Sequence, residues 1–129
     1  MNKILVEISA GELLDKISIL EIKKEKISDL EKLKFINDEY NVLKDQLDNN
    51  VKSDDKLNQL FHALKNINAK LWAIEDDKRL SEKNSDFGEK FIKLSRDVHF
   101  LNDDRAKIKL QINNYTGSKI KEIKEYTNY

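Results

Sequence analysis

The sequence predicts a mainly α fold: an antiparallel three-helix bundle built around one long helical hairpin. Three observations lead to this prediction. Proline is absent and glycine occurs only three times in 129 residues, so little interrupts a helix. Apolar residues alternate at spacings of three and four along most of the chain, which is the a/d repeat of coiled-coil packing. Turn-forming residues near positions 51 and 85 would reverse the chain twice and place successive helices antiparallel.

The composition is that of one small domain, which we expect to span residues 1–129. The 24 basic residues balance the 24 acidic ones, which argues against a nucleic-acid-binding protein. No apolar run approaches the roughly 20 residues that span a bilayer, and the N-terminus lacks the pattern of a signal peptide. Cysteine is absent, which excludes disulfides and thiolate metal sites. We therefore expect a cytoplasmic protein that does not interact with membranes.

The N-terminal third is expected to form a strand followed by a long helix. Residues 3–8 are β-prone and partly alternate, which predicts a short strand. Ser9 and Glu12 then form a capping box, which opens a first helix over about 10–48. The apolar phase of this helix slips over residues 27–33, where we expect a bend or local unwinding.

The remainder of the chain is expected to form two further helices and a short tail. The second helix is predicted over about 54–83 and the third over about 87–115, with Gly117 as the glycine that ends the third. The tail, residues 118–129, is predicted to form a short helix or a strand that pairs with the N-terminal one. Three of its apolar residues have helical spacing: Ile120, Ile123 and Tyr126.

Arg105 occupies a position on the otherwise apolar seam of the third predicted helix, between Leu101 and Ile108. A guanidinium on such a seam costs several kcal/mol unless it is paired and hydrogen-bonded. The lengths of the two hairpin helices place it level with Ile67 and Asn68. Two interpretations remain open. Arg105 pairs with a carboxylate of a neighbouring helix and fixes the register, or its bidentate fork recognises an anionic ligand.

Other polar side chains are expected to gather at one end and in the middle of the bundle. Most of them also fit ordinary i,i+4 pairs on solvated helix faces, worth a few tenths of a kcal/mol each. The three arginines stand out among 21 lysines. No catalytic residue is identified. The candidate anion-binding centre consists of Arg105, Arg79, Arg96, Glu12, Asp15, Lys16, Glu75, Asp76, Asn102 and Asp103.

Four large apolar side chains lie off the seams of their predicted helices and form the candidate interface: Trp72, Phe61, Ile92 and Phe100. Arg96 is four residues from both Ile92 and Phe100, so its aliphatic stem could cover them. Again two interpretations remain open. These side chains are buried under the terminal segments of the chain, or they form a surface for a protein partner or a second copy.

Metal and cofactor chemistry finds little support in the sequence. His62 and His99 fall on different predicted helices, and neither belongs to a histidine motif with metal-ligand spacing. No glycine-rich phosphate loop is present. We therefore expect neither a metal nor a cofactor.

Three phrases of the chain stand out: Val6 to Lys23, Leu71 to Asp76 with Arg79 and Glu82, and Asp86 to Ile92 continuing through Asn102 to Arg105, Ile112 to Asn113 and Thr116 to Ser118. Together they resemble a family of small bacterial and bacteriophage proteins of unknown function that is common in marine genomes. The resemblance covers most of the chain, and residues 28–65 match only in length and helical character. It implies no activity, cofactor or catalytic residue, although the genes of relatives sometimes lie near sugar-transfer genes.

Two classes of function are therefore carried forward. The first is a non-enzymatic interaction or accessory module with a protein partner or a second copy. The second is an anion-binding or enzymatic role in sugar or nucleotide metabolism, which requires the three guanidiniums to converge on one cleft. Replacing Arg105 by methionine should be neutral or stabilising if the arginine is structural and well paired. The sign reverses if the change leaves a carboxylate unpaired.

Overall fold

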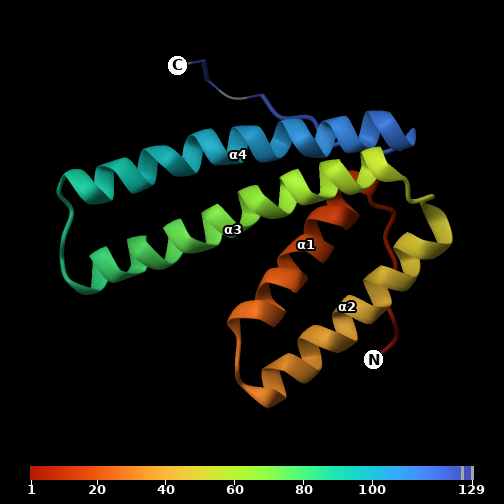
Figure 1. The fold of residues 1–129 in the computed structure, drawn as a ribbon, viewed down its shortest axis with the longest axis horizontal. Coiled ribbons are helices and arrows are strands. Elements are labelled where there is room, and N and C mark those ends of the chain that lie inside the picture. The colour runs from red at the N-terminus through yellow and green to blue at the C-terminus, as the bar shows by residue number, and fades with distance from the viewer. Residues whose placement is uncertain (126, 129) are drawn as a thin grey trace.

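The computed structural model of the chain contains four α-helices arranged as two antiparallel hairpins (Figure 1). The structure describes residues 1–125, 127 and 128. The short hairpin packs across one half of the long hairpin, so the other half projects as a two-helix arm (Figure 1). The short hairpin consists of α1 (Ala10–Lys26) and α2 (Leu30–Asn50), and the long hairpin of α3 (Asp55–Lys83) and α4 (Glu89–Thr116).

The predicted first helix over 10–48 is wrong, and so is the three-helix bundle. The backbone at Ile27 is extended (ψ 129°), which ends α1. The Asp29 carboxylate then accepts a hydrogen bond from the Lys32 backbone N–H at 2.9 Å and caps the start of α2. The chain therefore reverses where the apolar phase slips, instead of bending. An N-cap aspartate after a lysine-rich helical turn is a sequence signal for such a boundary.

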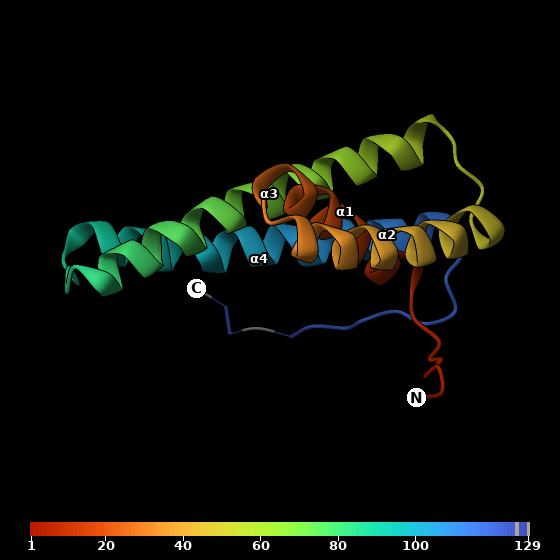
Figure 2. The ribbon, with the colours of Figure 1, turned by 90° about the horizontal axis from the view of Figure 1, so that it is seen from below.

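The predicted N-terminal strand is also wrong, because no strand occurs in the part of the chain that the structure describes. Residues 1–8 are irregular, and Ile4, Leu5 and Val6 are exposed. The described residues after Gly117 form neither the expected helix nor a strand; Tyr126, which belonged to that expectation, lies outside them. Both terminal segments lie on the same side of the helices (Figure 2). A β-prone segment needs a partner strand to form a ladder, and neither segment supplies one to the other.

The long hairpin begins and ends with recognisable caps. The Asp54 carboxylate accepts a hydrogen bond from the Leu57 N–H at 2.8 Å at the start of α3. α4 begins at Glu89, two residues later than predicted, since Asp86 accepts a hydrogen bond from the Gly88 N–H within the connecting turn. Gly117 follows α4 in the left-handed conformation (φ 71°), which glycine adopts without strain.

α1 lies at the centre of the fold and packs against the other three helices. Its burial on several faces explains why its sequence is apolar around more than one face. The main apolar cluster joins α1 to the long hairpin through Leu14, Leu57, Leu64 and Ile112. By contrast, α2 has no buried residue, and α1 is its only close backbone neighbour among the helices. α2 is therefore the most weakly held of the four helices.

Candidate functional site

Asp15 and Arg105 form a bidentate ion pair where α1 crosses the long hairpin. The Arg105 Nε donates to Asp15 Oδ1 at 2.9 Å, and an Nη donates to Oδ2 at 2.5 Å. The Asp15 side chain is 2% exposed, whereas that of Arg105 is 29% exposed. This parallel pairing of two N–H donors with two carboxylate oxygens is the strongest geometry that arginine offers a carboxylate.

Asn68 and Ser18 complete the hydrogen bonding around this carboxylate. The Asn68 side-chain amide donates to Asp15 Oδ1 at 2.9 Å and to Ser18 Oγ at 2.8 Å. The Ser18 hydroxyl in turn donates to the backbone carbonyl of Asp15 at 2.7 Å. Within the described residues, no buried side-chain nitrogen or oxygen is left without a partner. The cluster is thus a fully satisfied buried polar network, which we call the Asp15 network.

The electrostatics of the Asp15 network keep its acid and its bases charged. Burial raises the pKa of Asp15, but hydrogen bonds from Arg105 and Asn68 and the charges of Arg105 and Lys109 outweigh it, so that pKa lies below its ordinary value. The hydrogen bond to Asp15 raises the pKa of Arg105. Burial lowers the pKa of Lys109, but its bonds to Glu12 and Glu122 reverse the direction and raise it. These groups stay ionised at neutral pH.

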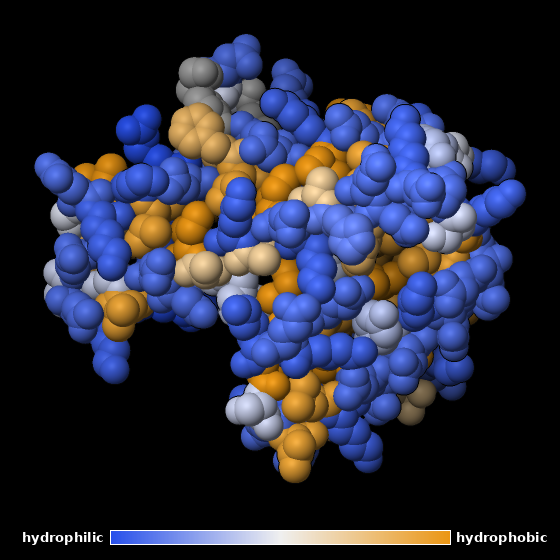
Figure 3. Space-filling view, viewed as in Figure 1, coloured by the Kyte–Doolittle hydropathy of each residue, from blue (hydrophilic) through white to orange (hydrophobic). Residues whose placement is uncertain are grey.

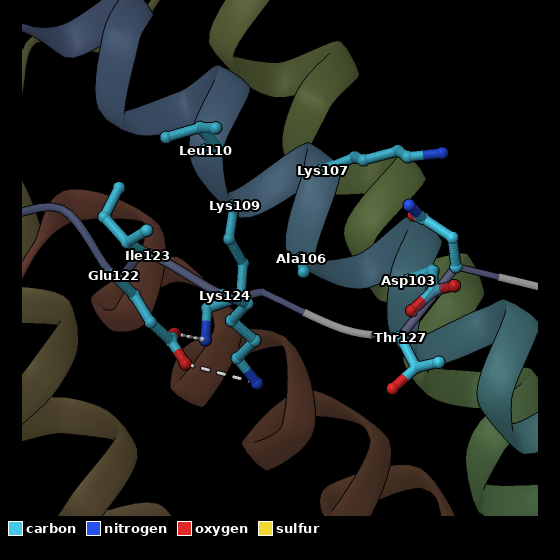
Figure 4. Close-up of a pocket in the computed structure, with 10 residues that line it drawn as sticks. Asp103, Ala106, Lys107, Lys109, Leu110, Glu122, Ile123, Lys124 and Thr127 are labelled. Atoms are coloured by element: carbon cyan, nitrogen blue, oxygen red, sulfur yellow. Dashed lines mark hydrogen bonds and ion pairs between the residues drawn. The ribbon is translucent and has the colours of Figure 1, made fainter.

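Lys109 extends the charges from the Asp15 network to the C-terminal tail. Its Nζ donates to Glu12 at 2.7 Å and to Glu122 at 2.8 Å, although its side chain is only 8% exposed. Figure 4 shows the carboxylate of Glu122, on the tail, facing the ammonium groups of both Lys109 and Lys124. The Lys124 Nζ lies 3.2 Å from Glu122 Oε1. Beside these groups, α4 and the tail enclose a groove of about 420 Å³. Its lining also includes Asp103, Ala106, Lys107, Leu110 and Ile123.

A close helix contact holds the start of α1 against the end of α4. The Gly11 N–H donates to the Asn113 side-chain oxygen at 2.6 Å. A Cβ at Gly11 would lie 2.5 Å from the Lys109 carbonyl oxygen, so only glycine fits there without movement. The Ala10 N–H also donates to the Ser118 hydroxyl at 3.3 Å, which ties the tail to the same place. The polar N-terminus of α1 is therefore satisfied by α4 and the tail.

The structure places the predicted polar residues in several positions. Glu12, Asp15 and Arg105 meet in or beside the Asp15 network, and Lys16 lies 3.6 Å from Glu12 at its edge. Asn102 is half-buried on α4, one turn before Arg105. A second hollow, of about 350 Å³, lies beside Arg105. Its lining includes Asn68, Trp72, Glu75, Asp76, Arg79 and Arg105.

Arg96 lies apart from the other two arginines. It lines a shallow hollow on α4 together with Ile92 and Phe100, which agrees with the predicted proximity of these three side chains. Phe61 lines a fourth cavity, between α1, α2 and α3. The four candidate interface residues thus occupy three separate places, and only Ile92 and Phe100 share one.

The candidate centre predicted from the sequence lacks six residues that the structure places at the site: Ser18, Asn68, Gly11, Asn113, Lys109 and Glu122. The lengths of the two hairpin helices place Asn68 level with Arg105, but they assign no role to Asn68. Gly11 carried a signal of its own, because glycine inside a predicted helix often marks a close backbone approach. For Ser18 and Asn113 the sequence alone holds no comparable signal.

Two searches of the described residues bear on other kinds of site. No group of three or more histidine, aspartate or glutamate side chains there is arranged to hold a metal ion. No helix in that part of the chain has an apolar stretch long enough to cross a membrane.

Comparison with known proteins places the whole arrangement in a family. Searches of curated proteins and of solved structures gave no significant match. A family model described as "Family of unknown function (DUF6165)" matches residues 4–129. That range contains all four helices, the Asp15 network and the described part of the tail. The chain belongs to this family of unknown function.

Proposed function

We propose that this chain is a non-enzymatic interaction module that presents its projecting arm to a partner protein. We define the arm as residues 74–101, which comprise the ends of α3 and α4 and their connection. The observation that carries the proposal is its exposed apolar surface. Ile92 is 55% exposed and Phe100 46% exposed, and Leu80 and Phe87 are similarly open to solvent.

The packing of the arm supports this proposal. Among residues 74–101 only Ser81 is buried, and neither α1 nor α2 extends over the free end of the long hairpin, where α3 is joined to α4 (Figure 1). Apolar patches lie along the arm between hydrophilic side chains (Figure 3). The terminal segments do not bury Phe100, which was the alternative expected from the sequence. Exposed apolar patches rimmed by polar residues are typical of protein interaction sites.

The charges of the Asp15 network suit a structural role better than acid–base catalysis. A general acid or base works best with a pKa near the operating pH. Every shift resolved in the described residues moves a pKa away from neutral pH. The pKa values of the shifted carboxylates are lowered, and those of the shifted lysines, arginine and tyrosine are raised. The charged groups of the Asp15 network are therefore suited to holding structure.

Affinity capture with matched variants tests the proposal. Tagged wild-type protein, the arm variant Ile92→Ser/Phe100→Ser and the control Phe35→Ser/Val42→Ser are each incubated with extract of the source cell. The control removes an equally exposed apolar pair from α2. We expect mass spectrometry to find proteins that wild type and control retain and the arm variant loses. Identical sets of proteins on all three baits would refute the proposal.

A second candidate function, binding of a small anion, is favoured by the hollow that Arg79 and Arg105 share with Trp72. Two features restrict it. Arg105 already uses Nε and one Nη on Asp15, and two carboxylates, those of Glu75 and Asp76, line the same hollow as the two guanidiniums. This balance disfavours a dianion, so the candidate ligand is a monoanion that also packs on Trp72. A thermal-shift screen that compares monoanions with dianions on wild type and Arg79→Met tests it; a ligand that stabilises both proteins equally would exclude this hollow.

A further inference from the structure

A cavity of about 340 Å³ lies where the two hairpins meet and is walled by α1, α2 and α3. Its apolar lining includes Leu14 and Ile17 from α1, Leu47 from α2, and Leu57 and Phe61 from α3. Leu14, Ile17 and Leu57 are buried. Most of the rest of the lining is polar, so this hollow combines apolar walls with hydrogen-bonding groups, as small-molecule sites between helices do.

The charged groups at the rim of this cavity already have partners. The Lys44 Nζ donates to Asp48 at 2.9 Å. Glu21 accepts a hydrogen bond from the Lys65 Nζ, which lies outside the lining, at 3.2 Å. A charged ligand would therefore have to break one of these pairs or enter without a counter-charge, which is costly in an apolar site. The rim thus favours an uncharged occupant.

Further polar groups line the same cavity. Tyr40 contributes a hydroxyl, Asn58 an amide and His62 ring nitrogens. These can orient one polar end of a molecule whose body lies on the apolar walls.

The wall formed by α2 offers a route of entry. None of its residues is buried, and α1 is its only close backbone neighbour among the helices. Segments with few buried apolar contacts open locally at low free-energy cost. Outward movement of α2 would open the cavity without disturbing the contact between α3 and α4.

We propose that this cavity binds an uncharged, mainly apolar small molecule with one polar end, which α2 admits and then covers. The proposal does not depend on the arm as an interaction surface, and it names a site that sequence analysis did not identify beyond Phe61. Binding should hold α2 in place.

A pair of fluorescent probes tests this proposal. N-phenyl-1-naphthylamine is uncharged, and 8-anilino-1-naphthalenesulfonate has a similar ring system with a sulfonate added. We expect the neutral probe to bind saturably with one site per chain. We expect the sulfonate to bind at least roughly tenfold more weakly. Hydrogen exchange of the α2 amides should slow in the presence of the neutral probe. Absence of saturable binding, or equal affinity for the two probes, would overturn the proposal.

Variants locate the bound probe. Asn58→Trp and Val51→Trp each place a bulky ring at the lining of the cavity, and Asn58 is exposed, so its replacement should not prevent folding. We expect at least one of them, with a wild-type circular dichroism spectrum, to weaken the neutral probe by roughly tenfold or more. The arm variant Phe100→Ser should leave affinity unchanged. Retention of binding by both tryptophan variants, or its loss in Phe100→Ser, would overturn the proposal.

Discussion

Removing Arg105 should destabilise the protein more than removing Asp15, because only the arginine can reach water. The Asp15 side chain is 2% exposed and that of Arg105 is 29% exposed. Arg105→Met leaves a buried, ionised carboxylate with the Asn68 amide as its remaining side-chain hydrogen-bond donor. Breaking a buried ion pair in this way costs about 3–5 kcal/mol. The structure therefore favours the reversed sign for this substitution, a loss of stability instead of a neutral or stabilising effect.

The opposite deletion should cost less. In Asp15→Ala the guanidinium can turn toward the solvent-filled hollow beside Trp72, and Asn68 keeps its hydrogen bond to Ser18. We expect a loss of about 1–3 kcal/mol, chiefly from the cavity and the lost hydrogen bonds. The double variant Asp15→Leu/Arg105→Met removes both charges, and its stability should lie close to that of wild type.

The pH dependence of these variants separates a charge effect from a packing effect. In wild type the pKa of Asp15 is lowered, so its contribution is fully present above the ordinary value of 3.8 and is lost as pH falls through the lower folded-state pKa. In Arg105→Met the main opposing cause is gone, and burial should raise that pKa above the ordinary value. The destabilisation should thus be larger at about pH 7 than at about pH 4.5, because acid favours the protonated, uncharged form of the buried Asp15 in this variant.

Urea unfolding followed by circular dichroism at the two pH values measures these differences. Lys107→Met is the matched control, because it removes an exposed positive charge from the same helix and should change stability by less than about 0.5 kcal/mol. An Arg105→Met protein within about 0.5 kcal/mol of wild type at about pH 7, or one whose deficit is the same at both pH values, would refute this reasoning.

Two further predictions concern the contacts around the Asp15 network. Gly11→Ala should lower stability by about 1–3 kcal/mol despite the higher helix propensity of alanine, since its Cβ would lie 2.5 Å from the Lys109 carbonyl oxygen. In thermal denaturation Gly88→Ala should show no such loss, because its Cβ would lie 3.4 Å from Asp86 Oδ1, an ordinary contact with an exposed side chain. Glu122→Gln should release the tail from Lys109 and speed the hydrogen exchange of the tail amides. The stability should change by less than about 1 kcal/mol, because the Glu122 side chain is exposed. Equal exchange in Glu122→Gln and the control Glu125→Gln would contradict this role.

The sequence predicted local helical order better than the path of the chain. Apolar residues recur at spacings of three and four from Leu33 to Leu47, and they form the half-buried face of α2. The phase slip over residues 27–33 predicts a bend or local unwinding, whereas the chain reverses its direction before Asp29. No glycine or proline marks this reversal. Local propensity alone does not favour a tight turn here. The packing of α1 against the other three helices stabilises it. The predicted strand failed for a related reason: residues 3–8 have β propensity, but a ladder depends on a partner that this chain does not supply.

The candidate site was predictable to the extent that a single residue broke a pattern. Arg105 stood on an apolar seam, and a buried carboxylate was one of the two partners considered for it. That the partner would be Asp15, shared with Asn68, depends on how α1 crosses the long hairpin, and the misplaced first turn concealed this crossing. Partners contributed by different helices cannot be ranked from spacing alone, since spacing describes one helix at a time.

The Asp15 network also explains how a small apolar core can hold two hairpins in one orientation. The main buried cluster contains only Leu14, Leu57, Leu64 and Ile112, and leucine and isoleucine surfaces tolerate sliding and repacking. A bidentate ion pair does not, because a shift of α1 along α3 would leave Asp15 buried without its donors. The direction of these hydrogen bonds therefore selects one crossing of the hairpins. This crossing in turn determines which half of the long hairpin is covered and which half projects as the arm.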